Sequence, residues 1–142
     1  MKVARNGKAA ALSADQFAAL LEAAPSPRYR ALWTVQRYAA ARIGETLSLT
    51  WADVAGGRIT FRAQRTKAGR TRQLPQVQQL AEVLERYRAA WAEEHGHEPQ
   101  QHEALFPAAG STTAFASRQG ADKALRATCK RLGLEGVSLH LS

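Results

Sequence analysis

An arginine beside an acidic stretch is the first feature of this chain that could do chemistry. Arg42 follows a run of apolar residues at helical spacing and precedes the pattern Glu-x-x-x-Leu-x-x-x-Asp, which begins at Glu45 and ends at Asp53. A planar guanidinium can pair two oxygens of a phosphate at once, so the residue suits charge stabilisation on a phosphate group. An arginine that caps the C-terminus of a helix would give the same pattern. The residue alone leaves both interpretations open.

A second candidate is a strip of cations in a segment with the signals of a β-hairpin. Residues 59–62 alternate apolar and polar side chains, Gly69 falls at the expected tip, and Pro75 closes the return strand. The cations of this strip are Arg62, Arg65, Lys67, Arg70 and Arg72. Such a strip could bind any phosphate chain through electrostatics alone.

These segments resemble, in their order along the chain, the sequence boxes of the tyrosine recombinases, also called phage integrases. Residues 41–54 resemble the box of the family's first catalytic arginine, residues 64–75 its basic hairpin, and residues 137–142 the start of its His-x-x-Arg box. The resemblance covers the chain from about Leu12 to Ser142. It implies site-specific DNA cleavage and rejoining through a 3′-phosphotyrosine bond, with double-stranded DNA as partner and protomer–protomer contacts on the DNA. It implies no metal ion, nucleotide or other small-molecule cofactor.

The resemblance assigns a role to each matching residue. Arg42 would stabilise charge on the nonbridging oxygens of the scissile phosphate, and Glu45 would orient it. Lys67 would enter the DNA groove on the hairpin and protonate the leaving oxygen, a role that we favour over a purely electrostatic one. His140 would hold the scissile phosphate or shuttle a proton, and an ordinary terminal histidine is the alternative. We assign DNA binding to the other cations of the strip, Arg62, Arg65, Arg70 and Arg72.

The chain departs from the family pattern in three respects. The residues before Arg42 are alanines, where a glycine is common. The N-terminal helical domain that clamps the other face of the DNA is outside this sequence. The family's second arginine, its later His or Trp and its nucleophilic tyrosine would follow the last residue given, Ser142. The tyrosines of this chain come too early to match that nucleophile, and they are Tyr29, Tyr38 and Tyr87.

We therefore expect residues 1–142 to be the amino-terminal part of a recombinase catalytic domain, with residues 1–11 flexible. Residues 137–142 are expected to fray or to pack on a neighbouring molecule. Such a chain, whether an excised piece or a natural remnant, would bind DNA and be inactive alone. The alternative is a non-catalytic DNA-binding module or regulator that retains the scaffold. A basic helical protein-interaction domain is a third interpretation.

The composition agrees with a nucleic-acid partner. The chain has 142 residues, 45% of them hydrophobic, and a net charge of +8, which suits one domain with a core that meets a polyanion. A lone Cys129, no long apolar run and no apolar signal segment indicate a reducing, cytoplasmic location, associated with the nucleoid through DNA. The histidines His95, His97 and His102 are expected to be solvated and not to hold zinc, because no cysteine lies nearby.

The elements that must position these residues are mostly helical. Apolar side chains recur every three or four positions, which predicts helices over about 28–40, 77–95 and 117–132, and a short helix over 45–49. A capping box at residues 13–16 begins an earlier helix. Strands are expected over 59–62 and 71–74, and the tryptophans Trp33, Trp51 and Trp91 in the core. The expected fold class is mainly α with a small antiparallel β-hairpin, as in a truncated tyrosine-recombinase catalytic domain.

A bridging-sulfur substrate tests the role of Lys67 in a cleavage-competent polypeptide that carries the family's tyrosine. An alkoxide is a poor leaving group, so Lys67→Ala should slow cleavage of normal DNA by about 10²–10⁴-fold. A sulfur at the 5′-bridging position leaves as a stable thiolate, so the same variant should cleave that DNA at close to the parental rate. Arg42→Ala should show no such rescue, because its task is charge on the nonbridging oxygens. Equal defects of Lys67→Ala on both substrates would show that Lys67 only holds DNA.

Overall fold

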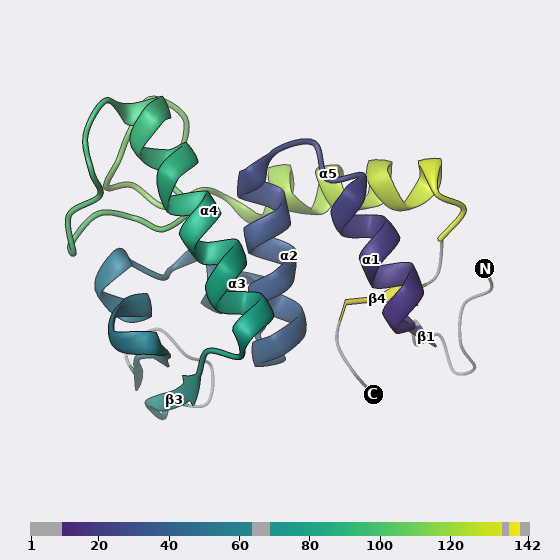
Figure 1. Cartoon of the computed structure of the whole chain (residues 1–142), viewed down its shortest axis with the longest axis horizontal. Coiled ribbons are helices and arrows are strands. Elements are labelled where there is room, and N and C mark those ends of the chain that lie inside the picture. Colours follow the sequence, from purple (N-terminus) through teal and green to yellow (C-terminus); the bar gives the residue numbers. More distant parts are fainter. Residues whose placement is uncertain (1–9, 64–68, 135–136, 140–142) are drawn as a thin grey trace.

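Helices make up most of the structure, a computed structural model that describes residues 10–63, 69–134 and 137–139 (Figure 1). The helices are α1 (Ala14–Glu22), α2 (Pro27–Ala39), α3 (Ile43–Leu47), α4 (Gln78–His95) and α5 (Arg118–Arg131), with a 3-10 segment, η2, at Trp51–Gly57. The strands are β1 (Ala10–Ala11), β2 (Arg58–Phe61), β3 (Arg72–Pro75) and β4 (Val137–Ser138). Because β2 and β3 pair antiparallel in a mostly helical chain, the expected fold class is confirmed.

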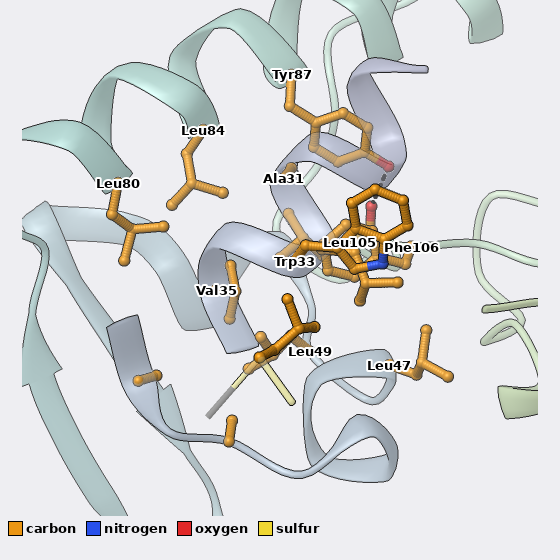
Figure 2. Packing of buried hydrophobic residues seen from close by; sticks show 14 of the residues in the cluster. Ala31, Trp33, Val35, Leu47, Leu49, Leu80, Leu84, Tyr87, Leu105 and Phe106 are labelled. Carbon is orange, nitrogen blue, oxygen red and sulfur yellow. Dashed lines mark hydrogen bonds between the residues drawn. The ribbon is translucent and has the colours of Figure 1, made fainter. Parts of the chain in front are cut away.

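The helix α2 lies at the centre of the fold and packs mainly against α4. Its residues Ala31, Leu32, Trp33 and Val35 are all fully buried, although they point to different sides of the helix. A helix that is apolar around most of its circumference belongs in the interior of a domain. Figure 2 shows leucine side chains of α4 projecting toward α2. The end of α2 is therefore a fixed point from which the next segment departs.

Aromatic side chains fill the space between α4 and the loop that follows it. Tyr87 stacks on Phe106 with ring centroids 5.4 Å apart, and its hydroxyl donates to the carbonyl oxygen of Leu105 at 2.6 Å (Figure 2). Trp51 also stacks on Tyr87, at 5.8 Å, and meets Trp91 edge-on at 6.0 Å. All three tryptophans of the chain are buried, which confirms their expected place in the core.

The loop between α4 and α5 holds the segment that follows α3. The N–H of Leu105 donates to the carbonyl of Leu49 at 2.9 Å, and the N–H of Trp51 donates to that of Glu103 at 3.0 Å. Between these two bonds, Thr50 forms an antiparallel bridge with the loop. Backbone pairing to a part of the chain far along the sequence therefore fixes the stretch from α3 to η2.

The hairpin strands bury the side that carries Ile59 and Phe61. Ile59 pairs with Leu74, and Phe61 pairs with Arg72. Ile59 and Phe61 are at most 2% exposed, so this side of β2 joins the core. The strands β2 and β3 differ by one residue from their expected bounds, and the hairpin tip at residues 64–68 lies outside the described residues.

The predicted starts of the first two helices are present. Ser13 Oγ accepts the N–H of Gln16 at 3.1 Å, and Gln16 Oε1 accepts the N–H of Ser13 at 2.8 Å, which confirms the capping box. The helix α2 begins at Pro27, whose fixed φ suits a first helical position, after the N-cap Ser26. The bounds of α2, α4 and α5 agree with the expected ones to within a residue.

The structure corrects three expectations. The short helix α3 spans Ile43–Leu47 and not residues 45–49, because Arg42 is its N-cap and the Glu45 carboxylate accepts the Arg42 N–H. The strand β1 forms within the segment expected to be flexible, and it pairs in parallel with β4. Leu139, next in sequence, is only 5% exposed, so the end of the chain expected to fray is packed as far as residue 139. Residues 1–9 and 140–142 lie outside the described residues.

The turn after α2 gives a stability prediction. Ala40 has φ 50° and ψ 40°, a left-handed conformation in which the Cβ of alanine is unfavourable, and its side chain is exposed. Ala40→Gly should therefore raise the free energy of unfolding in urea by about 1 kcal/mol. Ala19→Gly, at an exposed position inside α1, is the matched control and should lower it by about the same amount. A loss of stability in Ala40→Gly would show that this backbone conformation is not the one adopted in solution.

Candidate active site

The turn between α2 and α3 places Arg42 at the surface. Ala40 is the C-cap of α2, and the side chain of Ala41 is fully buried, so the chain is anchored immediately before the arginine. Arg42 is exposed and is the N-cap of α3, which rules out the role of C-cap to α2 that its sequence position allowed. Among the described residues, its guanidinium has no hydrogen-bond or ion-pair partner. A phosphate could therefore reach it without breaking an interaction with any residue that the structure describes.

Glu45 connects the two sides of this turn. Its side chain is 10% exposed, and its Oε1 accepts the backbone N–H of Arg42 at 3.3 Å. The same oxygen lies 3.6 Å from Nη1 of Arg72 on the hairpin. The acid that we expected to orient Arg42 thus holds its backbone rather than its guanidinium. This arrangement leaves the guanidinium available for another anion.

Arg72 reaches from β3 across to the end of α2. Besides Glu45, its Nη2 donates to the carbonyl oxygen of Ala39 at 3.4 Å. Its Cζ lies 4.4 Å from the ring centroid of Phe61, its partner across the strands. The side chain remains 38% exposed. One guanidinium therefore joins the base of the hairpin to both helices that flank Arg42.

Arg62, at the other side of the hairpin, also has an acidic partner. Its Nε donates to Oδ1 of Asp53 at 2.8 Å, and the Asp53 side chain is fully buried. Oδ2 of Asp53 accepts the N–H and the hydroxyl of Thr50, at 2.9 and 3.1 Å, and so closes the first turn of η2. Arg62 is about half exposed, so it can neutralise the buried carboxylate and still offer N–H groups to solvent. Arg70 is exposed near the start of β3.

Three of the predicted site residues, Arg65, Lys67 and His140, lie outside the described residues. The structure describes only the residues next to them in the sequence. The strands β2 and β3 flank the hairpin tip, and Leu139 precedes His140. The carbonyl oxygen of Leu139 accepts a hydrogen bond from Nη1 of the buried Arg37 at 3.3 Å.

The tyrosines of the chain are occupied elsewhere. Burial raises the pKa of the Tyr87 phenol, and its hydroxyl already donates to the Leu105 carbonyl. Tyr29 packs on Trp33 in the first turn of α2, at the opposite end of that helix from Arg42. Tyr38 is 43% exposed and meets Phe17 edge-on at 6.2 Å.

Of the three histidines expected to be solvated, two make contacts with other side chains. His95 packs on Trp91 at 4.3 Å, and His97 meets the same ring edge-on and lies 3.0 Å from Glu103 Oε1. His102 is exposed. Within the described ranges, no cluster of His, Cys, Asp or Glu could hold a metal ion. In the same ranges, no helix is long and apolar enough to cross a membrane.

A second basic surface was not among the predicted sites. Lys123, Arg126 and Lys130 are exposed on one face of α5, which contacts α3. In the part of the chain that the structure describes, none of the three forms an ion pair. Their spacing of three and four residues, visible in the sequence, puts them on one face of a helix. The sequence prediction took from this segment only its apolar stripe, which gave the bounds of the helix. We call these three residues the α5 basic face.

The sequence matches the model of the phage integrase family over residues 10–142. The chain therefore belongs to this family, and the resemblance to tyrosine recombinases is confirmed. A crystal structure of XerA recombinase is similar to it, with a TM-score of 0.70 and 21% sequence identity, covering 98% of this chain and 50% of that chain. This chain thus spans half the length of that recombinase, and at such an identity the likeness shows the fold alone. None of the curated proteins matches.

The buried Glu103 gives a pH prediction for the loop that supports the site. Burial alone would raise the pKa of its carboxyl group, but hydrogen bonds from Thr112, the Gln100 N–H and His97 outweigh burial and lower it to about 2. Because its pKa is lower in the folded state, the ionised carboxylate stabilises the fold at any pH above its pKa in the unfolded chain, which is about 4.3. This stabilisation is lost as the pH falls toward 2. Glu103→Gln should therefore lower the free energy of unfolding by about 2–3 kcal/mol at pH 7 and by much less near pH 2.

The exposed Glu98, whose side chain is 72% accessible, provides the control for Glu103. Glu98→Gln should change the free energy of unfolding by less than about 0.5 kcal/mol at either pH. A pH-independent loss in Glu103→Gln would show that packing, and not the ionised carboxylate, is what the residue contributes.

Proposed function

We propose that this chain supplies the phosphate-binding part of a DNA-breaking site in a site-specific recombinase or integrase. One observation carries the proposal. In a member of the phage integrase family, the exposed Arg42 has a guanidinium without a partner among the described residues, and Glu45 fixes its backbone. The hairpin that leads to Lys67 contacts the same carboxylate through Arg72.

The proposed task of Arg42 is charge stabilisation. When a nucleophile attacks phosphorus, negative charge grows on the nonbridging oxygens, and a bidentate guanidinium pairs both at once. Preorganised charge is effective because it needs no rearrangement during the reaction. The buried Ala41 on one side and the bond to Glu45 on the other supply that order for the backbone of Arg42.

Lys67 and His140 complete the proposed chemistry. Attack by a tyrosine oxygen forms a bond to phosphorus and breaks the bond to the 5′ oxygen, which leaves as an alcohol once it gains a proton. Lys67, on the hairpin tip, is the proposed donor of that proton. His140 is proposed to hold the same phosphate. It directly follows Leu139, whose carbonyl oxygen accepts a hydrogen bond from Arg37.

Double-stranded DNA is the proposed partner, bound through its backbone. The α5 basic face offers three exposed cations, and Arg70 and the half-exposed Arg62 offer more from the hairpin. Contacts of this kind position a protein on DNA and carry little sequence information. In a complete recombinase, we propose that further protomers bind beside this one on the DNA.

The nucleophile is proposed to come from outside residues 1–142. The buried Tyr87 hydroxyl is bonded, Tyr29 lies at the far end of α2, and Tyr38 packs on Phe17. No tyrosine of the chain follows His140 in the family's order. The 142-residue polypeptide should therefore bind DNA without cleaving it.

Fluorescence anisotropy with a labelled duplex of random sequence tests this function. Each neutralised phosphate contributes about −0.9 to the slope of log K against log salt, so a few contacts should give a slope of roughly −3 to −5. The variant with Lys123, Arg126 and Lys130 all changed to Gln should lose up to about three units of that slope. Arg86→Gln, on the exposed side of α4, is the control and should leave the slope unchanged.

The same mixture, denatured and run on a gel, should show no covalent protein–DNA adduct. A flat salt response, or no binding at low salt, would contradict a DNA role. A covalent adduct that disappears in Tyr38→Phe would show that the chain carries its own nucleophile.

A further inference from the structure

The Arg72 side chain is placed to act on Arg42 through Glu45. Arg72 belongs to the strip of cations that the sequence assigned to DNA, yet its guanidinium points into the protein at three partners. We propose that Arg72 is a positioning residue for Arg42 and not itself a DNA contact. This inference rests on the phosphate-binding role proposed for Arg42.

The first step of the argument is the shared oxygen. Oε1 of Glu45 accepts a hydrogen bond from the Arg42 N–H at 3.3 Å and forms an ion pair with Nη1 of Arg72 at 3.6 Å. With its side chain 10% exposed, the Glu45 carboxylate is weakly screened by solvent. An uncompensated carboxylate there would attract the Arg42 guanidinium and repel a phosphate. Arg72 supplies the compensating charge, so the guanidinium of Arg42 stays directed to an external anion.

The second step is the bond to α2. Nη2 of Arg72 donates to the Ala39 carbonyl at 3.4 Å, and Ala39 is the last residue of the helix. A cation at a helix C-terminus is favoured by the helix dipole and satisfies a carbonyl that lacks a partner within the helix. Arg72 therefore links the residue that precedes the turn to the acid that follows it, with Arg42 between them.

The third step is the shape of the side chain. The Arg72 guanidinium lies over the ring of Phe61, 4.4 Å from its centroid, and Phe61 is 2% exposed. Stacking on a fixed ring holds the planar fork in one orientation, so that two of its nitrogens face two different acceptors. A lysine carries the charge on a single ammonium and cannot meet both acceptors while stacked. The position thus requires arginine for its geometry as well as its charge.

A double-mutant cycle on DNA binding separates positioning from direct contact. Arg72→Gln, Glu45→Gln and the double variant are compared with the original chain in affinity for one labelled duplex. If Arg72 acts through Glu45, Arg72→Gln should weaken binding about fivefold in the original chain and less than about twofold when Glu45 is already Gln. Arg58→Gln, on the exposed end of the same hairpin, is the control for charge and should show the same small effect in both backgrounds.

Equal losses in both backgrounds, with a salt slope reduced by about 0.9, would overturn the inference and show that Arg72 neutralises a phosphate directly. Arg72→Lys provides the second variant, with the charge kept and the fork removed. It should weaken binding in the original chain and not in the Glu45→Gln chain. Undiminished DNA affinity of Arg72→Lys would contradict the requirement for the geometry of arginine.

Hydrogen exchange of the Arg42 amide supplies a readout that needs no DNA. In the proposed arrangement Arg72 holds the carboxylate that accepts this N–H, so Arg72→Gln should speed its exchange about fivefold or more relative to the amide of Leu105 in the core. Arg58→Gln should leave the ratio unchanged. An unchanged ratio in Arg72→Gln would refute the positioning role. If Arg72→Gln speeds the exchange as predicted but the original chain binds no DNA, only the proposed function is refuted.

Discussion

A single carboxylate oxygen joins the parts of this protein on which its proposed chemistry depends. Oε1 of Glu45 accepts a hydrogen bond from the N–H of Arg42 and forms an ion pair with Arg72. It lies between the end of α2, the start of α3 and the strand β3 of the hairpin. The helices α2 and α3 are consecutive in the sequence, and the hairpin strand β3 follows later, after η2 and β2. Because the carboxylate is nearly buried, small movements of any partner change its electrostatic energy more than they would in water.

The rest of the fold keeps that junction still. The core around α2 fixes where the helix ends, and the buried Ala41 anchors the turn. Behind α3, the loop between α4 and α5 pairs with the backbone on either side of Thr50, and Glu103 ties this loop together through His97 and the Gln100 N–H. Apolar packing thus sets the positions of the elements, and hydrogen bonds and ion pairs of a few buried acids set the orientations of the groups around them. A site that must hold an arginine at a phosphate needs both.

The sequence predicted what periodicity and local chemistry control. The helix patterns, the capping box at Ser13 and the hairpin strands all appear within about two residues of their expected bounds. The sequence did not predict the long-range pairings. The strands β1 and β4 lie near opposite ends of the chain, and each is only two residues long, too short to give a strand pattern. The partners of Arg62 and Arg72 were equally hidden, because a charge pattern shows where cations lie in the chain and not which acids the fold brings to them. The start of α3 was misplaced for a related reason, since arginine is not a usual N-cap.

A crystal structure of this chain bound to a DNA duplex tests the central claim most directly, because it shows where each guanidinium lies when phosphate is present. The account predicts that Arg42 pairs two nonbridging oxygens of one phosphate at about 2.8 Å, while Arg72 remains on Glu45 and Phe61. Arg72 on the DNA backbone, with Arg42 turned onto Glu45, would contradict it.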